Sequence, residues 1–156
     1  LRFGKWPEID GDVWRIPGSR MKMGRDHIVP LTPQSLALLA MLKGLAGESE
    51  WIVPGGRTGK PISENTMLYG LYRMGFHGRA TIHGFRGLAS TVLNESGLWS
   101  VDAIEKQLAH EPTNKVRSAY NAAQLLPERK RMLDWWSDYI EAAGKKSPTD
   151  LSDLLT

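Results

Sequence analysis

The pattern of apolar residues changes near residue 32, and this change limits the folds open to the chain. Before it, short runs rich in β-branched and aromatic residues occupy positions 5–10, 13–17 and 27–31, with Gly11-Asp12 and Gly24 as turn residues between them. Such runs predict strands. After it, apolar residues recur every three or four positions, which is typical of amphipathic helices. We therefore expect an α+β, mainly α, fold in which a small three-stranded antiparallel sheet precedes a helical bundle.

Capping and breaking residues mark the expected helices. Thr32 can cap a helix that has Pro33 at its first position, and Ser63 and Ser100 can cap two more. Gly97 and Pro112 are residues at which helices commonly stop. The expected helices cover residues 33–47, 61–75 (after the Ser63 cap), 82–97, 100–111 and 126–144, with a short helix or turn at 114–121.

Length and charge limit the class of protein. The 156 residues suffice for one domain, which we place at 1–144, followed by a tail at 145–156. Residues 1–133 carry a net charge of +6 and residues 134–156 one of −3, which suggests a polyanionic partner for the body. The sequence has no cysteine and no apolar run of membrane-spanning length, so we expect a cytoplasmic protein without a membrane partner.

Five polar residues lie outside the apolar faces and could act together. Lys22 lies in the polar connection at 18–26, and His83 and Arg86 are three residues apart in HGFR, so they share one helix face. His110 ends a helix in QLAH, and Tyr120 follows ten residues later. A cation, two imidazoles, a guanidinium and a phenol in this order suit chemistry on a phosphodiester.

Each of these residue types has a role in that chemistry. A guanidinium offers a planar fork that matches phosphate oxygens, and imidazoles donate hydrogen bonds or move protons near neutral pH. A tyrosine hydroxyl, with a free pKa near ~10, needs a cationic neighbourhood to attack and would become covalently linked to the phosphate. Lys22 could protonate the departing sugar oxygen. No metal or cofactor is implied, since the chain has neither HExxH nor an acidic cluster.

The segments MKMGRDHIVPL, HGFR, LAH and a downstream AY, in this order, resemble the catalytic domain of tyrosine recombinases, the phage integrase family. The resemblance implies a site-specific DNA recombinase of the prophage type, with the fold of DNA breaking-rejoining enzymes. It implies that Tyr120 forms a 3′-phosphotyrosyl link, that Lys22 is the general acid, and that Arg86, His83 and His110 stabilise the transition state. It also implies double-stranded attachment sites as substrates, four protomers on DNA for the full-length protein, and no small-molecule cofactor.

One departure from the family pattern affects the expected activity. The family has another catalytic arginine in a GxRxxE context before the first strand, whereas this chain begins at LRFGKW, and Arg2 lies too close to the strand to match. We therefore expect a fragment that is inactive alone. The alternative is a non-catalytic DNA-binding or assembly module with the same fold.

Several assignments have competitors. Arg20 and Arg25 compete with Lys22 for the general-acid role, and a metal-dependent hydrolase is disfavoured because the four histidines lack ligand spacing. Tyr120 could simply pack a helix corner. We interpret the basic run ERKR at 128–131 as a solvated helix face, with DNA contact as the alternative. The residues expected to contact DNA are Arg20, Arg25, His27, Arg79 and Lys115.

Overall fold

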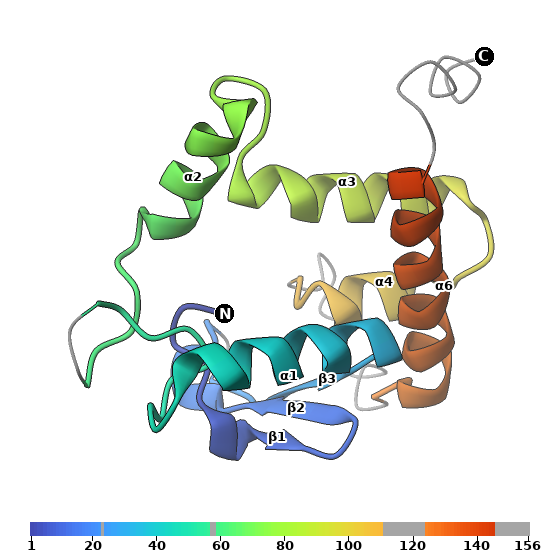
Figure 1. Ribbon diagram of the computed structural model, residues 1–156. Coiled ribbons are helices and arrows are strands. Elements are labelled where there is room, and N and C mark those ends of the chain that lie inside the picture. Colours follow the sequence, from blue (N-terminus) through green and yellow to red (C-terminus); the bar gives the residue numbers. More distant parts are fainter. Residues whose placement is uncertain (23, 57–58, 111–123, 146–156) are drawn as a thin grey trace.

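A small sheet opens the fold in the computed structural model, which describes residues 1–22, 24–56, 59–110 and 124–145 (Figure 1). The strands are β1 (Ile9–Asp10), β2 (Val13–Ile16) and β3 (His27–Pro30), and they pair antiparallel in the order β1-β2-β3. The predicted three-stranded sheet is confirmed. The first strand is shorter than expected because Trp6–Glu8 form a 3₁₀ turn, η1, in which Pro7 fixes a helical φ and has no N–H for a sheet.

The connection between β2 and β3 is closed at its base. A short 3₁₀ turn, η2, covers Gly18–Arg20, and the Gly18 N–H donates to Asp26 Oδ1 at 2.7 Å. Gly18 has to be glycine, because a Cβ there would lie 2.5 Å from the Gly24 carbonyl oxygen. Lys22 is therefore exposed in a loop whose two ends are joined by this hydrogen bond.

Helices make up most of the remaining chain, as predicted. They are α1 (Pro33–Ala46), α2 (Thr66–Leu71), the π-helical η3 (Tyr72–Phe76), α3 (Ile82–Glu95), α4 (Val101–Gln107) and α6 (Leu126–Lys145). The expected caps Thr32 and Ser100 accept hydrogen bonds from the Ser35 and Ala103 N–H groups. The expected short segment at 114–121 lies outside the described residues.

Two predicted boundaries are wrong. Ser63 does not cap α2, because its hydroxyl bonds the Thr66 hydroxyl at 2.8 Å and the helix begins at Thr66. α4 ends at Gln107 rather than just before Pro112, because Ala109 has a φ of 50° and a left-handed residue cannot continue the helix.

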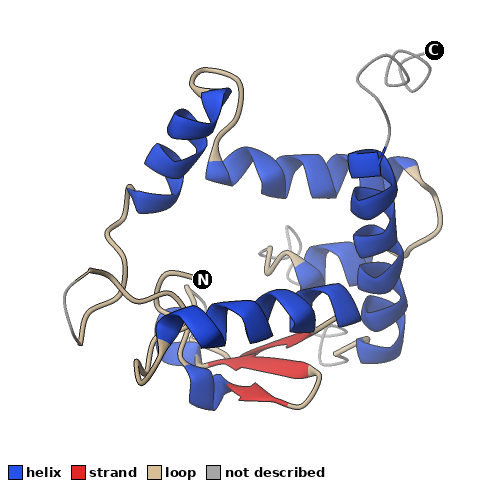
Figure 2. Ribbon diagram, viewed as in Figure 1, coloured by secondary structure: helices blue, strands red, loops and turns tan. Residues whose placement is uncertain are grey.

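Helix α6 connects the parts of the fold. It contacts α1, β3 and α4, while α3 contacts α4, and α1 lies across the sheet (Figure 2). The central core cluster is formed by Leu93 of α3, Ile104 of α4 and Met132 of α6, with Trp135 and Trp136 packed against it. Both tryptophans therefore contribute to core packing. Within the described part of the chain, no helix is both long and apolar enough to cross a bilayer.

Candidate active site

The HGFR motif lies in the first turns of α3. Thr81 caps this helix, because its hydroxyl accepts a hydrogen bond from the Gly84 N–H at 2.9 Å. His83 is exposed at the second helical position, and Arg86 is half-buried one turn later. The sequence predicted that the two share a helix face, and the continuous helix gives them that placement.

His110 lies just beyond the end of α4, and a carboxylate orients its ring. The His110 N–H donates to the Glu105 carbonyl at 3.0 Å, and Nδ1 lies 2.7 Å from Glu105 Oε2. A carboxylate only accepts hydrogen bonds, so Nδ1 carries a proton, and Nε2 donates to a ligand only when it carries a proton as well. The sequence reasoning missed Glu105, since no sequence pattern links a residue in a helix to one just past its end.

Basic side chains from several elements surround His27 on β3. Burial lowers the pKa of His27, and the positive charges of Arg129, Lys106 and Arg86 lower it further, against a hydrogen bond with the Gln107 backbone. These three cations come from α6, α4 and α3 respectively. Residues remote in sequence therefore bring positive charge to one place, beside the half-buried Arg86.

The same neighbourhood includes Arg25. Burial lowers the pKa of Lys106, and the charges of Arg129 and Arg25 add to the effect. Like charges repel when they are gathered in this way, and a bound anion relieves that repulsion. Arg25, Arg86, Lys106 and Arg129 around His27, which we call the cationic cluster, therefore give this region a positive potential that suits a phosphate group.

Other predicted site residues lie apart from this cluster or outside the described residues. Arg20 is engaged within the fold, since its guanidinium donates to Glu8 Oε2 and to the Phe3 carbonyl. Arg79 is exposed, with its guanidinium carbon 5.9 Å from the centre of the Phe76 ring. Tyr120 and Lys115 lie outside the described residues, so their predicted roles stay predictions.

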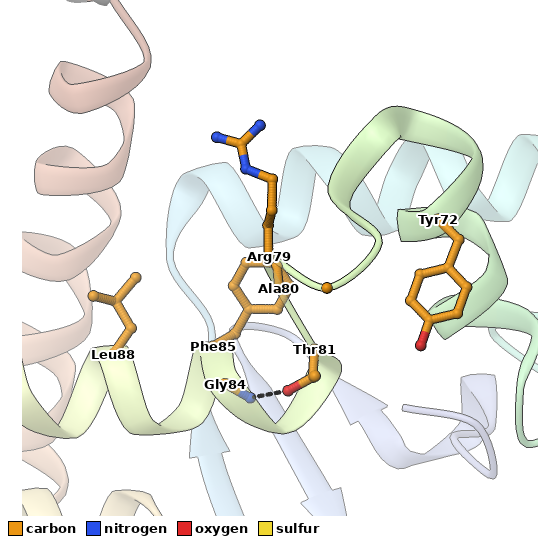
Figure 3. Close-up of a pocket in the computed structure, with 8 residues that line it drawn as sticks. Tyr72, Arg79, Ala80, Thr81, Gly84, Phe85 and Leu88 are labelled. Carbon is orange, nitrogen blue, oxygen red and sulfur yellow. Dashed lines mark hydrogen bonds between the residues drawn. The ribbon is translucent and has the colours of Figure 1, made fainter.

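A pocket of about 440 Å³ adjoins α3 but is not the place where the cations gather. Tyr72, Arg79, Thr81, Phe85 and Leu88 are among its lining residues (Figure 3). Successive residues of an α-helix are rotated by roughly 100° about its axis. The side of α3 that carries Phe85 and Leu88 is therefore roughly opposite the side that carries the histidine and arginine of HGFR.

Two further arginines have partners that the sequence did not predict. Arg2 donates through Nε to the Ile62 carbonyl at 2.9 Å and pairs through Nη1 with Glu64 at 2.8 Å, so it ties the chain start to the segment before α2. Arg129 lies within the run expected to be a solvated helix face, yet its side chain is fully buried. That interpretation is wrong for Arg129.

A model of the phage integrase family matches residues 5–125 of the chain. This range contains the sheet, the HGFR turn and the His110 region, and it covers most of the sequence. The chain belongs to the phage integrase family. The recognition made from the four sequence segments is thereby confirmed.

Several curated integrases are similar to the chain over nearly all of the chain's length. The integrase of Enterobacteria phage P4 is 43% identical over 94% of the chain, and the prophage integrase IntA of Escherichia coli is 44% identical over 92%. The integrase of Shigella phage Sf6 is 38% identical over 90%. The chain spans only 37%, 35% and 37% of these relatives. No solved structure matches this integrase chain.

Proposed function

We propose that this chain is the catalytic region of a site-specific DNA recombinase that cuts and rejoins attachment-site DNA through a 3′-phosphotyrosyl intermediate. The observation that carries the proposal is the cationic cluster, which includes Arg86, in a chain of the phage integrase family. A cluster of positive side chains from β3, α3, α4 and α6 suits a polyanion better than a neutral substrate. We further propose that residues 1–144 act as one unit, with residues 145–156 as a tail.

In this proposal the Tyr120 hydroxyl oxygen attacks the phosphorus of a DNA phosphodiester. The bond from phosphorus to the 5′ oxygen breaks, and that oxygen takes a proton from Lys22. Arg86 donates to the non-bridging oxygens, where negative charge grows. His110 donates there through Nε2 when its ring is doubly protonated, because Nδ1 donates to Glu105. His83 accepts the proton of the tyrosine hydroxyl. Donors fixed before the reaction lower its barrier by about 3 kcal/mol each. The His110–Glu105 contact supports this role, because it fixes the ring beforehand.

A denaturation-resistant adduct tests the nucleophile. The full-length recombinase should form it with nicked attachment-site DNA, in which loss of a short 5′ strand prevents rejoining. Tyr120→Phe should abolish the adduct while DNA binding changes little, since one hydroxyl is lost. Tyr139→Phe is the control, because that ring stacks on Trp135 and Trp136 in α6, with centroids 5.4 and 5.6 Å apart. An adduct that persists in the Tyr120 variant would sink the assignment, and binding without any adduct would favour the non-catalytic DNA-binding module.

A sulfur substitution tests the general acid. When sulfur replaces the departing 5′ oxygen, the leaving group is a thiolate of much lower pKa and needs no proton. Lys22→Ala should therefore slow cleavage of ordinary DNA by about a hundredfold or more, within the range of general acid catalysis, and cleave the sulfur substrate at nearly the wild-type rate. Arg25→Ala is the matched loop control. If the sulfur substrate restored the cleavage rate of the Arg25 variant and not that of the Lys22 variant, Arg25 rather than Lys22 would be the general acid.

DNA binding itself should be electrostatic. We propose that Arg25, His27, Arg79 and Lys115 contact the DNA backbone and that the full-length protein acts as a tetramer on two duplexes. Arg20 is a weaker candidate, given its contacts with Glu8 and the Phe3 carbonyl. The logarithm of the binding constant should fall linearly with the logarithm of the salt concentration. The slope should steepen by about 0.9 for each phosphate contacted.

A further inference from the structure

A buried guanidinium lies between three segments of the fold. The side chain of Arg129, on α6, has 0% of its surface exposed. It makes four hydrogen bonds: Nε and Nη2 donate to Gln107 Oε1 at 2.9 and 2.7 Å, Nη1 donates to the Gln124 carbonyl at 3.1 Å, and Nη2 donates to the Ile28 carbonyl at 2.5 Å. Four of the five N–H donors of the guanidinium thus have partners, with acceptors from β3, from the end of α4 and from the segment before α6.

Among the residues that the structure describes, the guanidinium has three acceptor atoms, and none of them belongs to a carboxylate. A buried charge without an ionic partner is costly, and replacing such groups by apolar residues often stabilises a fold. Burial lowers the pKa of Arg129 to about 10, so the group still carries its charge at neutral pH. Its electrostatic neighbours His27 and Lys106 are basic as well. Stability alone does not account for a cation in this place, whereas a need to hold β3 and the end of α4 in one arrangement does.

The two elements that Arg129 joins both lead directly to proposed site residues. Ile28 follows His27 on β3. Gln107 is the last residue of α4, and the chain then passes through the left-handed Ala109 to His110. The guanidinium therefore fixes the end of α4 relative to the sheet at the point where the chain turns toward His110.

We propose that Arg129 is a positioning residue of the recombinase site, which clamps the end of α4 to β3 so that His110 and His27 are held toward one DNA phosphate. The role rests on the proposed function. Arg129 acts through other residues, since its buried side chain is out of reach of a bound phosphate. A lysine offers no planar fork, so charge alone would not replace it.

The test compares variants in the full-length recombinase on nicked attachment-site DNA. Misplacement by about 1 Å can cost a hundredfold in rate, so Arg129→Met should slow adduct formation at saturating DNA by about ten- to a hundredfold. The dissociation constant for DNA should change by less than about fivefold. Arg129→Lys should also be slow, because it keeps the charge but loses the fork. Arg131→Met, which removes an exposed charge from the same helix, should react at the wild-type rate.

A second variant tests the same contact by changing the acceptor instead of the arginine. Gln107→Leu removes the acceptor of two of the four bonds and should slow adduct formation in the same way. The Arg129→Met/Gln107→Leu double variant should be no slower than the Arg129 variant alone, because both changes break one contact. If Arg129→Met does not fold, as judged by circular dichroism and thermal melting, Gln107→Leu and Arg129→Lys carry the test.

Several results would overturn the inference. A folded Arg129→Met protein that is less heat-stable but cleaves at the wild-type rate would show a purely structural arginine. A wild-type rate in Arg129→Lys would show that charge, not position, matters. If the rate loss in the double variant equalled the product of the two single losses, the two residues would act separately. Absence of any adduct from the wild-type protein would overturn the proposed function and this inference with it, whereas a normal wild-type adduct with normal variants overturns only the inference.

Discussion

At the scale of single residues, the cationic cluster has a measurable effect on His27 in the protein without DNA. Burial, and then the charges of Arg129, Lys106 and Arg86, lower the pKa of His27 below its ordinary value of 6.5. A proton–carbon NMR titration of the imidazole should give a midpoint below 6.5. Arg129→Met should raise that midpoint toward 6.5, while Arg131→Met should leave it unchanged. A midpoint above 6.5 in the wild-type protein would contradict the proposed arrangement of charges.

The lowered pKa of His27 also predicts how stability depends on pH. The unfolded chain binds a proton at this residue near pH 6.5, and the folded chain binds it only at lower pH. Between these two values the unfolded state holds more protons, so the free energy of unfolding falls as the pH is lowered through 6.5 toward the folded pKa. His27→Gln should flatten this part of the curve in urea melts at pH 7.5, 6.5 and 5.5. An unchanged pH dependence in that variant would assign the loss of stability to other groups.

The residues that sequence reasoning missed depend on contacts between distant positions. Arg86 and His110 could be proposed as site residues from the sequence because each lies in a short local motif. Arg129 could not, because its burial depends on Gln107, which is 22 residues away, and on Ile28, which is 101 residues away. An arginine in a basic run looks solvated until the acceptors for its fork are known.

At the scale of elements, Thr32 joins two helices that are far apart in sequence. Its hydroxyl accepts from the Ser35 N–H at 3.2 Å, which caps α1, and it bonds the Ser137 hydroxyl of α6 at 3.0 Å. The residue is 3% exposed. Thr32→Val keeps the shape and removes both bonds, together with a 3.0 Å bond to the Ser35 hydroxyl, and it leaves the Ser35 N–H without its cap. The free energy of unfolding should fall by about 1–3 kcal/mol.

Urea unfolding followed by circular dichroism measures this loss. Thr32→Ser keeps the hydroxyl and should lose much less. Ser100→Ala is the matched control, because Ser100 caps α4 through the Ala103 N–H, and within the described part of the chain its hydroxyl bonds no other helix. This variant should cost about 1 kcal/mol. Equal losses in Thr32→Val and Thr32→Ser would mean that the methyl group, not the hydroxyl, matters.

The accuracy of the predicted elements follows from how local their signals are. The caps Thr32 and Ser100 and the strand pairing depend on neighbours in sequence, and all three predictions are confirmed. The start of α2 is wrong because Ser63 and Thr66 both have hydroxyls and bond each other, which leaves Asn65 at the boundary. Competing side chains of the same kind make a cap ambiguous in sequence.

At the scale of the whole molecule, α1 is apolar on two sides and only one of them packs. Leu36, Leu39 and Leu42 form the half-buried side. The adjoining side carries Leu38, Met41 and Leu45, which are 61%, 68% and 83% exposed. A helix that is apolar nearly all round is usually covered on all sides. The sequence pattern cannot reveal that one side is open, because leucines at both sets of positions look alike.

This exposed stripe predicts the behaviour of the 156-residue chain in solution. Exposed apolar patches bind apolar dyes and promote association, so the chain should enhance anilinonaphthalene sulfonate fluorescence under native conditions. Replacing Met41 and Leu45 by lysine should reduce that fluorescence severalfold, while far-ultraviolet circular dichroism stays unchanged, because both side chains contribute little to packing. Ala37→Lys/Ala40→Lys adds the same charge on an exposed side of α1 without removing much apolar surface, and it should leave most of the dye signal. Equal loss in the two double variants would assign the signal to charge, and no loss in either would place the dye elsewhere, for example on the exposed Phe85 and Leu88 of α3.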